Sequence, residues 1–187
     1  MPPVKMNTVA WGLLVVAGLA APFLVYPVFA MKILCLALFA CAFNLLLGYT
    51  GLLSFGHAAF LGTAGYVTGH TVKVLGFQPE IGILAGTATA AALGYVIGSL
   101  AIRRSGIYFA MITLALAQMV YFMSLQMPFT GGEDGLQGVP RGKLFGMIDL
   151  LHPLYMYYFV FAIFLPAFWV IYRTIHSPFG QVLKAIR

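Results

Sequence analysis

The fold of this chain is decided by ILCLALFACAFNLLLGYTGLLSFGHAAFLGTAGYVTGHTV, residues 33–72, which contains no formally charged side chain. As one continuous helix this stretch would extend for about 60 Å, roughly twice the hydrocarbon thickness of a bilayer, so the helix must break. Residues 48–57 combine three glycines with threonine, serine and histidine, which makes them poor helix interior. We predict two apolar arms, 33–47 and 58–72, joined by a broken or re-entrant region near 48–57.

The composition of the whole chain also indicates a membrane protein. Of its 187 residues, 62% are hydrophobic and 7% are charged, whereas soluble domains average about 45–50% apolar and about 25% charged residues. So few charges cannot cover a surface in water, which excludes a soluble enzyme, a disordered chain and a nucleic-acid binder despite the net charge of +6. The expected fold class is all-α, a polytopic integral membrane helical bundle.

Charge-free runs predict the other membrane segments. They are residues 6–31, 81–102, 106–127 and 151–172. These four runs have 22 to 26 residues, near the roughly 20 that a span needs. Together with the two shorter arms of the broken stretch they make about six segments. We expect Pro22 and Pro27 to bend or end the first segment near its far end.

The basic residues predict the orientation of these segments. If Arg103 and Arg104 lie in the cytoplasm, alternation places six basic residues inside, and four basic and all four acidic residues outside. Cytoplasmic loops carry an excess of lysine and arginine. We therefore expect the N-terminus and Arg187 to be cytoplasmic, and the polar loop 128–149 to lie outside.

Small residues recur at every fourth position of the segment 81–102. They are Gly82, Gly86, Ala90, Gly94 and Gly98. Such a stripe lets another helix approach closely in lipid. It serves either packing within this chain or contact with a second subunit, and the sequence favours packing within the chain.

No pattern in the sequence predicts catalysis. The histidines and cysteines lack the spacing of metal ligands, and no catalytic residue, metal site or cofactor is expected. We therefore predict that the protein is not an enzyme.

The broken region is the strongest signal for function, because transporters place broken helices along the substrate path. The candidate path residues are Thr50, Ser54, Gly56 and His57, with Thr113 and Gln118 from the segment 106–127. A helix beginning near residues 54–58 would direct its positive end toward a carboxylate. Two alternatives stay open: the break is an ordinary short loop, and Gln118 serves an interhelical hydrogen bond, which the sequence favours over substrate contact.

Four blocks of the sequence resemble one family. They are NLLLGYTGLLSFGHAAF (44–60), GIYFAMITLALAQ (106–118), TGGEDGLQGVPR (130–141) and SPFGQVLKAIR (177–187). This order is similar to that in the inner-membrane permeases of branched-chain amino-acid ABC importers, the LivM/LivH family, and is more LivM-like. Urea-importing relatives share the first block, whereas the GGEDG form favours the amino-acid branch.

The resemblance implies a single transmembrane permease domain over residues 1–187, in the bacterial inner membrane, that forms the path for Leu, Ile or Val. It implies a second permease subunit, two cytoplasmic ATPase subunits that bind the ATP, and a periplasmic amino-acid-binding protein. Membrane lipid is the remaining partner, and no nucleic acid is expected. Because family members continue beyond residue 187, we expect this chain to be truncated. The alternatives are a passive channel or facilitator, a permease for a related substrate such as urea, and a membrane scaffold.

The tail 174–187 resembles the start of the family's cytoplasmic coupling segment. Ser177 and Pro178 suit a helix start, as capping hydroxyl and first-turn proline. From there an apolar face follows, formed by Phe179, Val182, Leu183 and Ile186. The residues expected to couple to the ATPase are Phe179, Gly180, Leu183 and Ala185. A helix lying on anionic lipid would give the same pattern.

Overall fold

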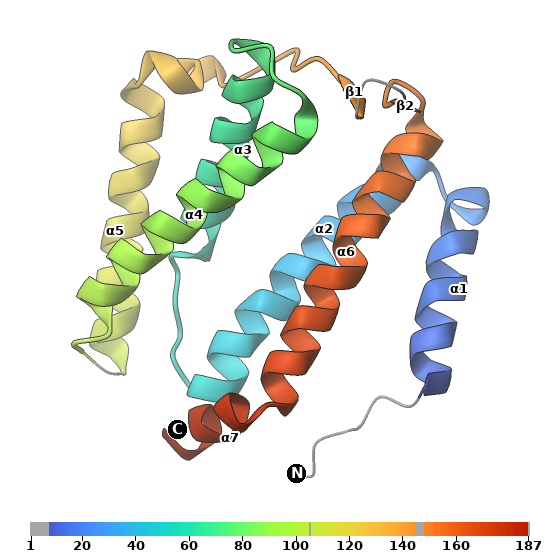
Figure 1. The fold of residues 1–187 in the computed structure, drawn as a ribbon. Coiled ribbons are helices and arrows are strands. Elements are labelled where there is room, and N and C mark those ends of the chain that lie inside the picture. The colour runs from blue at the N-terminus through green and yellow to red at the C-terminus, as the bar shows by residue number, and fades with distance from the viewer. Residues whose placement is uncertain (1–7, 105, 145–147, 187) are drawn as a thin grey trace. The chain divides into compact units, whose positions relative to one another are not determined.

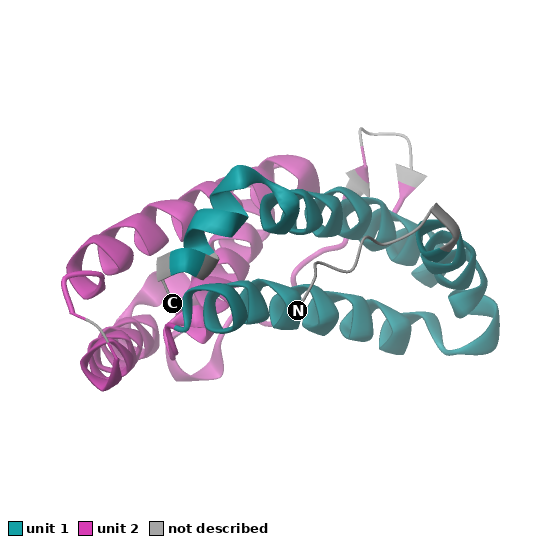
Figure 2. Cartoon of the chain, turned by 90° about the horizontal axis from the view of Figure 1, so that it is seen from below, with its two compact units in different colours: residues 1–51, 151–187 teal, residues 52–150 magenta. Residues whose placement is uncertain are grey.

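The computed structural model describes residues 8–104, 106–144 and 148–186. The chain forms two compact units, one of residues 1–51 and 151–187 and the other of residues 52–150 (Figure 2). The helices of the first unit are α1 (Thr8–Leu24), α2 (Pro27–Asn44), the π-helix η1 (Leu45–Thr50), α6 (Pro153–His176) and α7 (Pro178–Ile186). The second unit contains α3 (His57–Lys73), α4 (Pro79–Ala101), α5 (Ile107–Gln126), the 3-10 turns η2 (Pro128–Thr130) and η3 (Gly132–Asp134), and the short antiparallel strands β1 (Lys143–Leu144) and β2 (Ile148–Asp149).

The predicted all-α membrane architecture is confirmed. Within the described residues, four helical segments are long and apolar enough to cross a membrane: 27–50, 79–101, 107–126 and 153–176. Residues 10–24 form a shorter apolar helix, and α3 has 17 residues. The expected number of about six membrane segments therefore stays a prediction.

The first predicted segment, 6–31, is not one helix, and it ends just before Pro27, one of the two prolines expected to bend or end it. Pro22 lies inside α1, which ends at Leu24, and α2 already begins at Pro27. Proline suits the first turn of a helix because its φ is preset and its missing N–H has no helical partner there. It also disfavours the helical conformation of the residue before it, and Tyr26 is extended, with φ −55° and ψ 125°. The helix that contains the predicted arm 33–47 thus starts six residues before that arm, at Pro27.

In the first unit, α6 packs along α2, and α1 contacts both of them (Figure 1). Ala30, Tyr157, Phe161 and Phe164 form the buried cluster. Tyr157 donates a hydrogen bond of 2.6 Å to the carbonyl of Gly18, and the Phe161 ring lies where a Gly18 side chain would be. Aromatic packing and one partly buried hydrogen bond therefore hold α1 against α6.

In the second unit, α3 packs against the first half of the small-residue stripe of α4. A Cβ at Gly82 would lie 2.8 Å from Val72 Cγ2, and one at Gly86 would lie 2.6 Å from the carbonyl oxygen of Ala64. Thr68 adds a hydrogen bond of 3.0 Å to the carbonyl of Gly82. This part of the stripe serves packing within the chain, as the sequence favoured.

We expect Gly86→Leu to destabilise the protein more than any other substitution in the stripe. The new side chain would meet backbone of α3 rather than a movable side-chain end, and overpacking of this kind costs about 1–3 kcal/mol or more. Gly98→Leu is the matched control, because a Cβ there would meet no described atom within 4 Å. Thermal unfolding in detergent measures both. Equal midpoints for the two variants would show that this helix contact does not contribute to stability.

Candidate functional site

The predicted break in the membrane helix is present but shorter than expected. The helix after Asn44 continues as the π-helix η1 to Thr50, so Gly48 lies inside helical structure. Gly51 ends it with φ 69°, a left-handed conformation that glycine adopts without steric cost. Residues 51–54 are irregular, residues 55 and 56 make a turn, and α3 starts at His57.

The end of the break is bound to α5. The backbone N–H of Phe55 donates to Thr113 Oγ1 at 3.2 Å, and the N–H of Gly56 donates to Ser54 Oγ at 3.2 Å. Thr113 Oγ1 also donates to the carbonyl of Ala110 at 3.0 Å. Ser54 is 4% exposed and Thr113 is 1% exposed. These two hydroxyls therefore position the broken backbone, since burial leaves them almost no free surface.

We expect Thr113→Val to loosen the break. Valine keeps the shape but removes the acceptor of the partly buried Phe55 N–H, and a typical intramolecular hydrogen bond contributes about 0.5–1.5 kcal/mol. Thr113→Ser, which retains the hydroxyl, should behave like the original chain. Hydrogen exchange of the Phe55 amide measures the effect, and equally slow exchange in the valine variant would contradict this role of Thr113.

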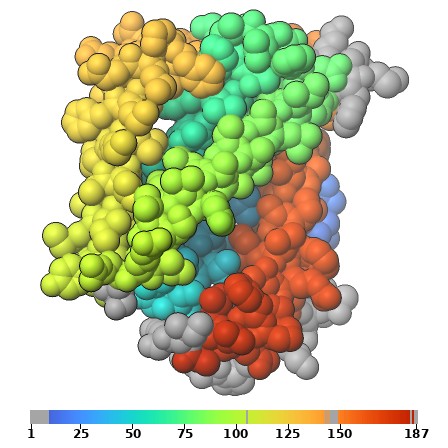
Figure 3. All heavy atoms as spheres, turned by 60° about the vertical axis from the view of Figure 1, so that its left-hand side comes forward, coloured from blue at the N-terminus to red at the C-terminus, as the bar shows by residue number. Residues whose placement is uncertain are grey.

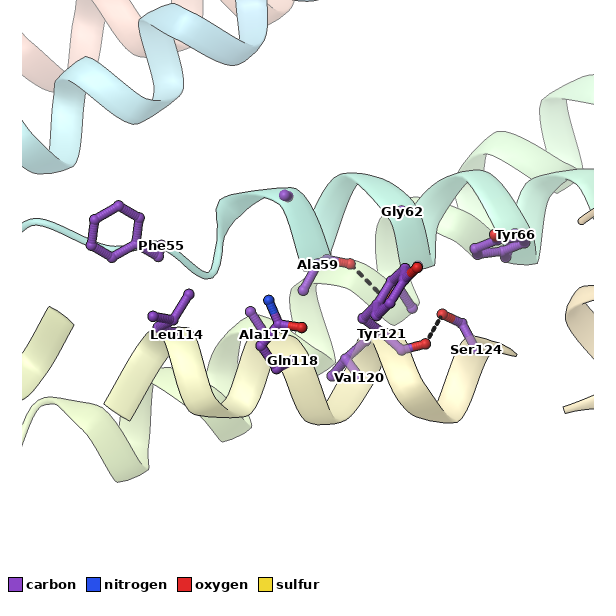
Figure 4. A pocket seen from close by; sticks show the side chains of 12 residues that line it. Phe55, Ala59, Gly62, Tyr66, Leu114, Ala117, Gln118, Val120, Tyr121 and Ser124 are labelled. Atoms are coloured by element: carbon purple, nitrogen blue, oxygen red, sulfur yellow. Dashed lines mark hydrogen bonds between the residues drawn. The ribbon is translucent and has the colours of Figure 1, made fainter. Parts of the chain in front are cut away.

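A cavity of about 360 Å³ lies beside this anchor, between α3 with its preceding turn and α5 (Figure 4). Its lining is Phe55, Ala58, Ala59, Gly62, Thr63, Tyr66, Leu114, Ala117, Gln118, Val120, Tyr121 and Ser124. The volume is at the lower end of the range of ligand pockets. The walls are mostly apolar, so the cavity suits a small ligand with an apolar part.

Few polar groups face this cavity with hydrogen-bonding capacity to spare. Thr63 donates to the carbonyl of Ala59 at 2.7 Å, and Ser124 donates to that of Tyr121 at 2.8 Å. Within the described residues the side-chain amide of Gln118 has no hydrogen-bond partner, and Gln118 is on the cavity wall. The structure thus supplies no interhelical hydrogen bond for Gln118 there and places its amide where a ligand could meet it.

A second cavity, of about 450 Å³, continues along α3 on the side of the loop after α5. It shares Gly62 and Tyr66 with the first. Its lining is Gly62, Gly65, Tyr66, Gly69, Asp134, Gly135, Leu136 and Val139. The three α3 glycines recur at spacings of three and four, which places them on one face of the helix. Sequence reasoning missed this glycine face, although its spacing could have revealed it.

The loop 128–139 contacts the end of α3. Figure 3 shows the loop beside the turn between α3 and α4. The ring of His70 stacks on that of Phe129 at a centroid distance of 4.0 Å, and its Nδ1 lies 3.1 Å from the Phe129 carbonyl oxygen. Lys73 Nζ donates to the carbonyl of Gln137 at 2.6 Å. These contacts fix the outer wall of the second cavity.

The remaining two candidate path residues are not among the lining residues of these cavities. His57 is the first residue of α3, with its ring edge-on to Phe60 at 6.0 Å. Thr50 belongs to the first unit, where its hydroxyl donates to the carbonyl of Leu46. Of the six candidates, Ser54, Gly56 and Thr113 therefore meet at one point, and Gln118 lies on the adjoining wall.

The predicted helix start at Ser177 and Pro178 is confirmed. The N–H of Gly180 donates to Ser177 Oγ at 3.4 Å, and α7 runs from Pro178. Phe179 is 60% exposed and Val182 is 54% exposed, so these two residues leave apolar surface available. Leu183 is half-buried and Ala185 is exposed.

Gly180 has a role within the chain. A Cβ at Gly180 would lie 2.6 Å from the carbonyl oxygen of Thr174 and closer still to that of Ile175. Its missing side chain therefore permits the tight corner between α6 and α7.

Together, the apolar helices, the break and the small cavity beside it define a multi-pass α-helical membrane protein with a candidate site for a small molecule. The chain belongs to the family described as "Branched-chain amino acid transport system / permease component", whose family model matches residues 26–187. This is a family of transport permeases rather than a class of enzymes.

Two curated relatives carry the description "High-affinity branched-chain amino acid transport system permease protein LivM". The chain is 32% identical to the protein from Salmonella typhimurium and 31% identical to that from Escherichia coli, in each case over 110 residues and 56% of this chain. The matched part spans 25% of the length of each relative. No solved structure matches the chain.

Proposed function

We propose that this chain is part of the permease of an ATP-binding-cassette importer for branched-chain amino acids in the bacterial inner membrane. The observation that carries the proposal is the cavity beside the broken helix, in a chain that belongs to a branched-chain amino-acid permease family. Leu, Ile and Val each combine an apolar side chain with a carboxylate and an ammonium group. A small, mostly apolar cavity with few polar groups suits these substrates.

The geometry supports one orientation of the substrate in this cavity. Phe55, Ala58 and Ala59 line the end where α3 begins, and the positive end of a helix favours a carboxylate. Leu114, Ala117 and Val120 are apolar lining residues from α5, suited to the branched side chain. The Gln118 amide and the hydroxyl groups of Tyr66 and Tyr121 are further polar groups of the lining residues. In this proposal the substrate arrives through the second cavity and passes Tyr66, which lines both.

The proposed partners are a second permease subunit, two cytoplasmic ATPase subunits and a periplasmic amino-acid-binding protein. The exposed apolar residues of α7, Phe179 and Val182, are the proposed contact with an ATPase. In this arrangement both ends of the chain are cytoplasmic, and the loop 128–139 faces the periplasm, where the binding protein delivers the substrate. The excess of basic residues on the proposed cytoplasmic side supports this orientation.

Reconstitution of the complete permease with its partners in liposomes tests the proposal. We expect accumulation of labelled leucine that requires ATP and the binding protein. Equilibration of leucine without ATP would instead identify a facilitator. Transport of urea but not leucine would assign the chain to the urea-importing relatives.

A further inference from the structure

The first unit contains no acidic side chain. Residues 1–51 and 151–187 include no Asp or Glu, but they include five basic residues. Arg173, near the end of α6, therefore has no carboxylate side chain in its own unit to neutralise it. An arginine at the end of a membrane-spanning helix can meet another kind of anion, the phosphate groups of the bilayer.

A cavity of about 270 Å³ lies at the corner between α6 and α7, next to this arginine. Its lining is Trp169, Tyr172, Arg173, His176, Ser177 and Pro178. The guanidinium carbon of Arg173 lies 5.8 Å from the centre of the Trp169 ring, a cation–π contact that restrains the charged group. Tryptophan and tyrosine are enriched at the level of lipid headgroups, which is where the end of a spanning helix lies.

His176 contributes an unused hydrogen-bonding atom. Its Nδ1 lies 2.9 Å from the carbonyl oxygen of Tyr172, and a carbonyl only accepts, so the proton is on Nδ1. The other ring nitrogen, Nε2, is buried and has no hydrogen-bond partner within the described part of the chain. In the neutral ring, Nε2 is an acceptor. A buried polar atom normally has a hydrogen-bond partner. A hydroxyl donor would supply the hydrogen bond that His176 Nε2 lacks.

From these three observations we infer a binding site for an anionic phospholipid whose headgroup carries a hydroxyl group, the chemistry of phosphatidylglycerol. The phosphate accepts hydrogen bonds from the Arg173 guanidinium, which can bind it through two N–H groups. A headgroup hydroxyl donates to His176 Nε2 once the imidazole ring, which lines the cavity, shifts to expose this buried atom. The acyl chains extend along the apolar surface of α6, which a free phosphate could not use.

The test uses the purified chain in nanodiscs of phosphatidylcholine with phosphatidylglycerol, and measures by native mass spectrometry the ratio of the two lipids retained. We expect enrichment of phosphatidylglycerol, and a loss of that enrichment of at least about fivefold in Arg173→Gln, from about 1 kcal/mol per basic residue near an anionic surface. Lys32→Gln removes the same charge from α2 of the same unit, but Lys32 does not line the cavity, so this variant should change the ratio less than Arg173→Gln. Because both lipids are counted in one sample, the ratio does not depend on the yield of folded protein.

A second comparison tests the hydroxyl contact. Phosphatidylmethanol carries the same phosphodiester charge without a headgroup donor, so it should be retained less than phosphatidylglycerol, and His176→Phe should abolish that difference. Equal retention of phosphatidylglycerol and phosphatidylcholine, or an equal effect of Arg173→Gln and Lys32→Gln, would overturn the site. Displacement of the lipid by equimolar glycerophosphoglycerol, which has no acyl chains, would assign the site to a soluble phosphodiester and overturn the lipid assignment.

Discussion

Gly56→Leu is expected to reduce leucine uptake by the assembled importer to the background of a complex without this subunit. Gly56 is buried at the turn before α3, and its φ of −76° is available to any residue. Glycine is therefore required at position 56 because it is small, and not because of its backbone conformation. A Cβ there would lie 3.5–3.8 Å from Ser54, Phe60 and Thr113, so the further carbons of leucine have no room and would displace the anchored break beside the cavity.

Gly56→Ala provides the graded control, since one methyl group makes only ordinary van der Waals contacts at these distances. It should retain most of the uptake. Co-purification of the ATPase subunits with both variants separates lost transport from lost assembly. Normal uptake by the Gly56→Leu variant would show that the break is an ordinary connecting loop.

Val182→Asp is expected to have the second largest effect, uncoupling ATP hydrolysis from uptake. Val182 is 54% exposed on the apolar face of α7, so a carboxylate there does not disturb the core of this chain. In a complex it would be buried against an ATPase subunit, and an unpaired buried charge is strongly destabilising. Leucine uptake in liposomes should fall at least tenfold, while the ATPase subunits continue to hydrolyse ATP.

Gln181→Asp introduces the same charge one residue earlier, at an exposed position off the apolar face, and should transport nearly normally. This pair also distinguishes docking from attachment to anionic lipid, because an added negative charge would weaken lipid binding at either position. Similar losses in both variants would contradict docking through the apolar face.

The broken membrane helix could be predicted because it follows from length and residue type alone. An apolar run of about twice the bilayer thickness has to break, and glycine-rich residues are the weakest helix formers in it. Its start was placed too early, since Gly48 is accommodated in the π-helix η1. The end of α1 was misplaced for a related reason. The predicted bound followed the charge at Lys32, although Pro27 was expected to bend or end the segment, and α2 begins at Pro27.

The contacts that shape the candidate site could not be predicted from sequence. Thr113 was proposed as a path residue because it is polar in an apolar helix, but it accepts a backbone hydrogen bond from Phe55, 58 residues away in the chain. The hydrogen bond from Lys73 to the carbonyl of Gln137 likewise depends on how the loop folds back over α3. Such pairings are set by tertiary packing, which local periodicity does not specify.

The central claim, that the cavity between α3 and α5 is on the substrate path, is tested most directly by labelling of a single cysteine in it. Ala117→Cys, on the cavity wall, is made in a complex whose chain has Cys35 and Cys41 replaced by serine. Ala115→Cys is the control, because Ala115 is exposed and lies two residues away on the opposite side of α5. Leucine is predicted to slow the reaction of N-ethylmaleimide at position 117 several-fold and to leave position 115 unchanged. Equal reaction rates at position 117 with and without leucine, in a complex that transports leucine, would contradict the account.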